Sequence, residues 1–189
     1  MDLDNYSSLK GHLLMAMPSL ADPNFEHSVT CISEHTSDGA FGIVINRIFD
    51  GLNAQAIFEE LGIKFDIDAH NVPIHIGGPV HVNELFVLHG APFDGDGLFM
   101  VNDSLALNNS RQILEAIAQA AGPQQYLIAL GCAGWGSGQL EQELKQNAWL
   151  SLPCAQDILF EVPIEERWKS AMGRLGIDPD LLSDAAGNA

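Results

Sequence analysis

The stretch GCAGWGSGQLEQELKQNAW, from Gly131 to Trp149, sets glycines at close intervals, continues with helical spacing and ends on a tryptophan. It follows QYLIALG (125–131), an apolar run typical of a buried strand. The order strand, glycine-rich loop, helix is the one that phosphate-binding enzymes use. The fold around this stretch therefore depends on whether it binds a phosphate, supports a reaction or only turns the chain.

The glycine-rich stretch lacks the features of a phosphate loop. A P-loop ends in lysine and serine or threonine, and the dinucleotide fingerprint is GxGxxG; neither pattern occurs here. Glu141 and Glu143 fall in the first turn of the expected helix, where they complement its positive end and repel an anion. We expect the segment to be mainly a structural corner, with Trp135 as an anchor that also shapes a surface.

A thiol nucleophile is equally disfavoured. The nucleophile elbow has the form GxSxG, whereas GCAG places a glycine directly beside Cys132. The three cysteines, Cys31, Cys132 and Cys154, have unrelated spacings and no CxxC pair. This pattern predicts neither a disulfide framework nor a zinc ribbon, and reduced thiols are typical of a cytoplasmic protein.

Outward from this stretch, apolar periodicity predicts strands and helices along the whole chain. A helix is expected from Asn53, which is a suitable N-cap, and another over 110–121 with a buried stripe at 113, 114, 117 and 121. Pro163 should open a final helix with Ile164, Trp168 and Leu175 as its core stripe. The expected strands are GHLLMAM (11–17), SVTCISE (28–34), AFGIVIN (40–46), PIHIGG (73–78), ELFVLHG (84–90), GLFMVND (97–103), QYLIALG (125–131) and AWLSLP (148–153).

The strands outnumber the helices and come both as hairpins and as crossovers, which favours an α+β fold. We predict one compact domain over 1–189, built on a mixed, strongly curved β-sheet flanked by helices. Residues 1–8 and 183–189 should be flexible at the two ends.

The charge balance excludes some partners. The chain has 25 Asp and Glu against 8 Lys and Arg, a formal net charge of -17, which repels nucleic acid and anionic lipid. The apolar patch LLMAM (13–17) is too short for a membrane span or a signal core, and two aspartates precede it. We expect a cytoplasmic protein with a protein partner, no membrane contact and no direct nucleic-acid binding.

Seven histidines suggest a metal site, most plausibly formed by His75, His81 and His89. No pair has the HExxH spacing, and strand alternation could place His75 and His89 on different faces, so surface or hydrogen-bonded histidines are the favoured interpretation. The segment FDGDG (93–97) resembles part of a calcium loop, but its twelfth position, counted from Asp94, is Leu105 rather than glutamate. We expect a turn there, no metal and no cofactor.

Two strand ends are candidate binding elements. In HIGGPV (75–80), two glycines before a proline expose backbone groups, so the segment either lines a pocket or forms a tight turn. Asn46 and Arg47 end another strand and could complete such a pocket. Arg47 would then bind an anionic ligand; the favoured alternative is an ion pair with a carboxylate.

Taken together, several segments resemble the YqgE/AlgH family of bacterial proteins. The resemblance covers essentially the whole chain and rests on LLMAMPSLADPNFEHSV, GIVINR, HIGGPV, GCAGWGSGQLEQEL with NAWL, and the later ILF, ERW and LGID elements. It implies a compact α+β domain of cytoplasmic bacterial proteins, described in some species as a regulator of alginate synthesis or transcription, with no established reaction. Two positions differ from the family pattern: Ile48 replaces a usual proline, and Cys132 a usual tyrosine.

The leading functional interpretation is a non-enzymatic regulatory or scaffolding domain that acts through protein contacts, with any effect on transcription indirect. The alternative is a hydrolase or small-ligand enzyme with its site between HIGGPV and the Trp135 segment. No residue is assigned a catalytic role. The candidate ligand- or partner-binding residues are Asn46, Arg47, His75, Gly77, Gly78, Trp135, Gly138, Gln139 and Glu141.

Overall fold

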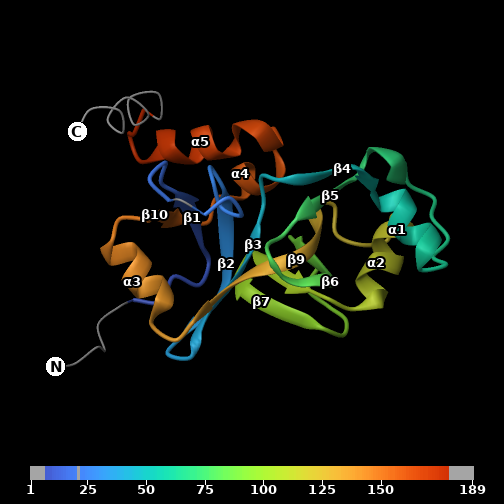
Figure 1. Ribbon diagram of the computed structural model, residues 1–189. Helices are drawn as coiled ribbons and strands as arrows, with labels where there is room; N and C mark the ends of the chain where they lie inside the picture. The colour runs from blue at the N-terminus through green and yellow to red at the C-terminus, as the bar shows by residue number, and fades with distance from the viewer. Residues whose placement is uncertain (1–6, 21, 179–189) are drawn as a thin grey trace.

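The computed structural model describes residues 7–20 and 22–178, and shows ten strands in one continuous sheet (Figure 1). The segments expected to be flexible lie largely outside this range. No helix in the described ranges is long and apolar enough to cross a bilayer. The strands are β1 His12–Ala16, β2 Val29–Thr36, β3 Gly39–Val44, β4 Ile48–Asn53, β5 Pro73–Ile76, β6 Val80–His89, β7 Leu98–Asn102, β8 Leu105–Asn108, β9 Tyr126–Gly136 and β10 Trp149–Pro153.

Five α-helices and two 3-10 turns complete the described fold. The helices are α1 Ala54–Glu60, α2 Arg111–Ala118, α3 Gln139–Lys145, α4 Gln156–Phe160 and α5 Arg167–Arg174; the 3-10 turns are Ala69–Asn71 and Ile164–Glu166. The expected Asn53 cap is confirmed, since its side chain accepts a hydrogen bond from the Ala56 N–H. Ser110 caps α2 in the same way, through the Ile113 N–H.

The main path of the sheet runs β10-β1-β2-β3-β9-β6-β8-β7, with β4 paired to β5 and β5 paired to β9. All of these pairs are antiparallel except β5 with β9, so the sheet is mixed. It curls into a half-barrel (Figure 1), which confirms the predicted curved α+β architecture. Strand β9 pairs with β3, β5 and β6. It therefore connects the part of the sheet formed by β10, β1, β2 and β3 to the part formed by β4 to β8.

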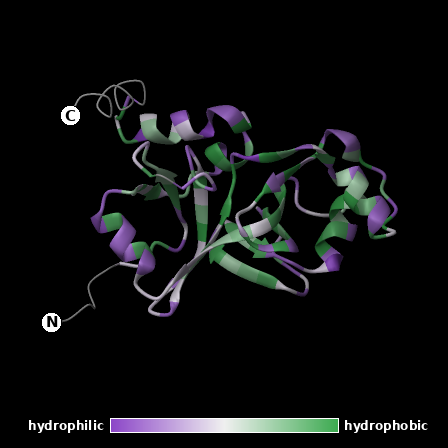
Figure 2. Ribbon diagram, viewed as in Figure 1, coloured by the Kyte–Doolittle hydropathy of each residue, from purple (hydrophilic) through white to green (hydrophobic). Residues whose placement is uncertain are grey.

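Successive side chains along a strand point to opposite faces of the sheet, so neighbouring residues pack into different apolar clusters. Leu13 belongs to the cluster inside the curl, whereas its neighbour Leu14 belongs to a second cluster under α3. A third cluster lies between β5, β6, β9 and the pair α1 and α2. Figure 2 shows the apolar colour concentrated on the strands and on the inward sides of the helices. Ile158, Leu159, Ala171 and Met172 of α4 and α5 complete the inner cluster.

The glycine-rich segment differs from its prediction as a loop. Strand β9 continues through it to Gly136, so only Ser137 and Gly138 turn the chain before α3. Gly39, Ala40, Phe41 and Gly42 of β3 pair with 133–136. A Cβ atom on Gly39 would lie 2.2 Å from the Trp135 carbonyl oxygen, so glycine permits this close approach.

The carboxyl-terminal helix also differs from its prediction. A 3-10 turn follows Pro163, and α5 begins only at Arg167. Its buried residues are Arg167, Ala171 and Met172, while Leu175, expected in the core, is 39% exposed. The buried face of the helix thus carries Arg167, whose guanidinium donates a hydrogen bond to the buried Ile45 carbonyl, together with Ala171 and Met172.

Candidate functional site

A carboxylate on α3 joins two tryptophans from different strands. Trp135 of β9 and Trp149 of β10 both donate their indole N–H to Glu143 Oε2, at 2.9 and 2.7 Å. The Gln139 amide donates to the other oxygen, Oε1, at 2.9 Å. Because both oxygens accept hydrogen bonds from side chains, this carboxylate is placed to hold the two indoles rather than to take a proton from a ligand.

Aromatic packing closes the same cluster. The Phe25 ring lies 6.0 Å from the Trp135 ring and 5.5 Å from the Trp149 ring, and the two tryptophan rings are 5.8 Å apart. Trp135 is 6% exposed. The side chain is therefore an anchor of the fold, as expected, and its polar N–H faces Glu143 rather than solvent.

The start of α3 is held by two further contacts. Gln139 Oε1 accepts the Gly136 N–H at 3.0 Å, and Gly138 has a left-handed φ of 72° that turns the chain into the helix. The buried His35 accepts the Leu9 N–H on Nδ1, so its proton lies on Nε2 and is donated to Glu141 at 3.0 Å. Glu141 thus fastens α3 to β2.

The two glycines of HIGGPV lie directly against β9. A Cβ on Gly77 would lie 2.1 Å from the Gly131 carbonyl oxygen, and one on Gly78 would lie 2.3 Å from the Cys132 carbonyl carbon. Gly77 N–H donates to Leu130 O, and its carbonyl accepts from Val44 N–H. These contacts explain both glycines by backbone packing between strands.

His75, the first residue of that segment, is buried beside Arg167. Its Nδ1 lies 3.3 Å from the Ile128 carbonyl, and its Nε2 lies 3.5 Å from the Arg167 guanidinium. Burial, and then the charge of Arg167, lower the pKa of His75 to about 4. At neutral pH the ring is therefore uncharged, with Nδ1–H donating to the carbonyl and Nε2 facing the guanidinium.

Arg167 is a central residue that sequence reasoning did not single out. It is 6% exposed and donates hydrogen bonds to the Val162 and Ile45 carbonyls. Burial lowers the pKa of the guanidinium to about 10. The available sequence signal was its place in the ERW element, but an arginine in a helix normally projects into solvent.

Asn46 and Arg47 hold the turn that precedes β2. Asn46 accepts the Val29 N–H at 2.7 Å and donates to the His27 carbonyl at 2.8 Å. Arg47 donates to the carbonyls of Pro23, Asn24 and Glu26. The guanidinium is thus occupied by backbone oxygens, in place of the carboxylate partner that the sequence favoured.

The candidate residues therefore lie in separate hydrogen-bond networks rather than in one site. Trp135 and Gln139 both bond to Glu143, and Glu141 bonds separately to His35. His75 pairs with Arg167, and Asn46 and Arg47 bond to the turn at 22–28. Each network connects parts of the chain that are distant in sequence.

Comparison with known proteins identifies the fold family. The protein-family model described as AlgH-like matches residues 13–180. A UPF0301 protein of Desulforapulum autotrophicum is 49% identical over 181 residues, which cover 96% of each chain. This chain belongs to the AlgH-like family. A UPF0301 protein of Alcanivorax borkumensis is 45% identical over 191 residues and is covered completely.

Solved structures are similar over the same length. The solution structure of the AlgH protein from Pseudomonas aeruginosa has a TM-score of 0.78 and 42% identity, with both chains covered completely. A crystal structure from Corynebacterium diphtheriae, at 23% identity and a TM-score of 0.72, covers 95% of this chain and shares the fold. These matches establish the family and its architecture, and their names assign no reaction.

The structure also shows where this AlgH-like chain places the three candidate metal-binding histidines and the thiol of Cys132. His75 and His89 are buried, whereas His81 is exposed beside Glu84. Across residues 7–20 and 22–178, no three His, Cys, Asp or Glu side chains gather as metal ligands would. Burial raises the pKa of Cys132 to about 11, so its thiol stays protonated at neutral pH.

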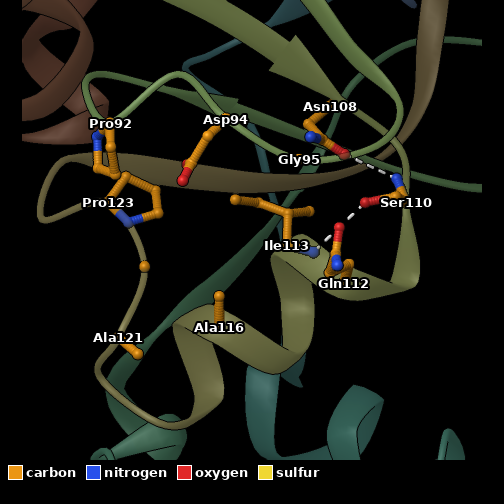
Figure 3. Close-up of a pocket in the computed structure, with 11 residues that line it drawn as sticks. Pro92, Asp94, Gly95, Asn108, Ser110, Gln112, Ile113, Ala116, Ala121 and Pro123 are labelled. Atoms are coloured by element: carbon orange, nitrogen blue, oxygen red, sulfur yellow. Dashed lines mark hydrogen bonds between the residues drawn. The ribbon is translucent and has the colours of Figure 1, made fainter.

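A hollow of about 210 Å³ lies between the 92–95 loop, the start of α2 and the turn at 121–123 (Figure 3). Figure 3 shows the Asp94 side chain extending into it on the side of Pro123. Asn108 accepts the Ser110 N–H at 2.8 Å, and Ser110 caps α2. The hollow is smaller than most ligand pockets, and Asp94 is the one charged residue among those that line it.

Proposed function

We propose that this AlgH-like chain is a non-enzymatic regulatory or scaffolding domain that works through protein contacts. The observation that carries the proposal is a set of exposed apolar side chains on β6 and β7. Val82 is 57% exposed, Val80 39%, and Phe99 and Met100 38% each. Exposed apolar side chains on strands are typical of surfaces that a partner covers.

The polar side chains support the same proposal, because those that could take part in a reaction are already held in contacts within the fold. Glu143 accepts from both indoles, and His75 stays uncharged beside Arg167. The alternative, a hydrolase site between HIGGPV and the Trp135 segment, gains no support from the backbone contact between Gly78 and Cys132. A substrate would need an open space between the two segments, but their backbones are in direct contact there.

The charge distribution favours a protein over a nucleic acid as partner. Most of the few basic side chains take part in internal contacts: Lys10, Arg47, Arg111, Arg167 and Arg174. A DNA-binding surface needs several basic side chains on one face. Any influence on transcription is accordingly proposed to be indirect, in the cytoplasm, where the free cysteines stay reduced.

Affinity capture from the native host, with this protein as bait, tests the proposal. We compare the wild type with a variant in which Val80, Val82, Phe99 and Met100 are all serine. We expect one protein to be recovered at near-stoichiometric amounts with the wild type and lost with the variant, while both melt at similar temperatures. A variant that keeps the partner, or a wild-type bait that enriches nothing over an unrelated acidic protein, would refute the proposal.

A further inference from the structure

Strand β7 is an edge strand of the sheet, open along its length except at its carboxyl end, where a Cβ on Gly11 would lie 3.4 Å from Asn102 Nδ2 and 3.7 Å from the Val101 carbonyl oxygen. It ends the strand order and pairs with β8 on one side. In Figure 1 it lies along the lower margin of the half-barrel. A strand in this position presents backbone N–H and C=O groups to which another extended chain can add.

An aromatic hollow lies where β7 meets residues of β8, β6 and β3. Phe41, Phe86, Phe99 and Leu107 line a space of about 210 Å³, together with Gly97, Asn108 and Asn109. Phe99 belongs to β7 itself, and the rings of Phe41 and Phe86 meet edge to face at 5.6 Å. The hollow has room for one apolar side chain of a segment lying along β7.

The surroundings of β7 attract positive charge. Asp96 and Asp103 are exposed on either side of it in the chain. The Lys10 ammonium lies 4.2 Å from the centre of the Phe99 ring and 3.7 Å from Glu34. The face of Phe99 therefore already holds an ammonium group in a cation–π contact.

We propose that β7 is the docking site for an extended segment of a partner protein in which basic and apolar residues alternate. The segment adds to the sheet as a further strand, one apolar side chain enters the Phe99 hollow, and basic side chains approach Asp96 and Asp103. Backbone hydrogen bonds supply affinity, while the hollow and the two carboxylates select the sequence. The inference rests on the proposed function and names the chemistry of its partner.

A second copy of this chain fits the same edge poorly. If two β7 strands paired antiparallel about a two-fold axis between Phe99 and Met100, Asp96 of one copy would face Asp103 of the other, at both ends. Each copy also carries a net charge of -17. Like charges placed opposite each other across a strand pair destabilise it. A basic partner therefore matches this edge better than self-association does.

Peptide binding to the full-length protein, followed by amide chemical shifts, tests this assignment. The probe is the capped peptide KVKFKVK; the controls are EVEFEVE and the block peptide KKKKVFV, which has the charge and composition of the probe without its alternation. We expect the probe to bind about tenfold more tightly than either control. The largest shift changes should fall on residues 98–102.

Two charge-matched variants separate local recognition from total charge. Asp96→Lys with Asp103→Lys should weaken binding of the probe about tenfold. Glu60→Lys with Glu161→Lys changes the net charge equally at exposed sites on other elements and should leave binding within about twofold. Equal weakening by both pairs, equal binding of the probe and the block peptide, or shift changes centred away from β7 would overturn the inference.

The same experiments distinguish this inference from the proposed function. If the probe does not bind at β7 but capture from the host still depends on the four apolar side chains, the docking site is wrong and the proposed function stands. If capture does not depend on them, the proposed function fails, whatever the peptide does.

Discussion

Replacing Glu143 with alanine removes the acceptor that two distant tryptophans share. Trp135 is 6% exposed and Trp149 3%, so water cannot readily take the place of the carboxylate. A buried donor that loses its partner destabilises a protein by about 1–3 kcal/mol. Two indole N–H groups donate to Glu143, so we expect Glu143→Ala to lower the free energy of unfolding by about 2–6 kcal/mol.

Glu143→Gln refines the prediction. The amide keeps one acceptor oxygen but places an NH₂ group against either the indoles or the Gln139 amide, which now donates to Oε1. We expect a loss of about 1–3 kcal/mol, roughly half that of the alanine variant.

Urea unfolding, followed by circular dichroism and by tryptophan fluorescence, measures these losses. Glu60→Ala is the matched control, because Glu60 is an exposed helical carboxylate on α1 and its loss should change stability by less than about 0.5 kcal/mol. If the free energy of unfolding of Glu143→Ala lies within about 0.5 kcal/mol of that control, solvent reaches the two indoles and their hydrogen bonds to Glu143 do not stabilise the fold.

The remaining predictions concern packing, titration and charge. Trp135→Ala should lower stability by about 3–5 kcal/mol in thermal or urea unfolding, because it empties a buried aromatic site. Burial lowers the pKa of His75 to about 4 from 6.5, so the stability that its neutral form contributes is complete above about pH 6.5 and is lost as the pH falls towards 4. The stability of the wild type relative to His75→Gln should therefore fall by about 3 kcal/mol between pH 7 and pH 4, and a constant difference would contradict the burial of the ring beside Arg167. Gly78→Ala should unfold the protein or strongly destabilise it, whereas Gly173→Ala, in α5 with no heavy atom within 4 Å of the added Cβ, should stabilise it by about 0.5–1 kcal/mol. Gel mobility shifts at physiological salt should show no specific DNA complex, and a salt-resistant complex would contradict the charge argument.

Short-range patterns in the sequence were sufficient for much of the secondary structure. The Asn53 cap and the buried residues Ile113, Leu114 and Ile117 of α2 are confirmed, whereas Ala121, expected in the same stripe, is exposed beyond the end of the helix. These features depend on groups within a few residues of one another, so the sequence alone contains the interaction. Most strands were likewise recognisable by apolar runs, although β4, β8 and the short helix α4 were not predicted.

The glycine-rich segment was misjudged because its partner is distant. Glycines are weak strand formers, and their frequency between 131 and 138 favours a loop on local grounds. In the fold, β3 approaches so closely that a Cβ on Gly39 would meet the Trp135 carbonyl at 2.2 Å. Within the segment, a Cβ on Gly131 would lie 2.5 Å from the Gly78 carbonyl oxygen, whereas one on Gly134 or Gly136 would meet no heavy atom closer than 3.5 Å. The pairing of 133–136 with β3 depends on residues almost a hundred positions away, so local composition does not show it.

The sequence by itself determined the acidic charge, the elements with local caps and stripes, and the resemblance that the family match confirms. Only the tertiary structure decided the roles of the polar side chains. Arg167 reaches the Ile45 carbonyl across 122 positions of the chain, and His35 reaches Glu141 across 106. Whether a charged side chain is solvated, paired or buried depends on groups that are brought close only when the sheet curls, because electrostatic and hydrogen-bond energies depend on distance in space rather than along the chain.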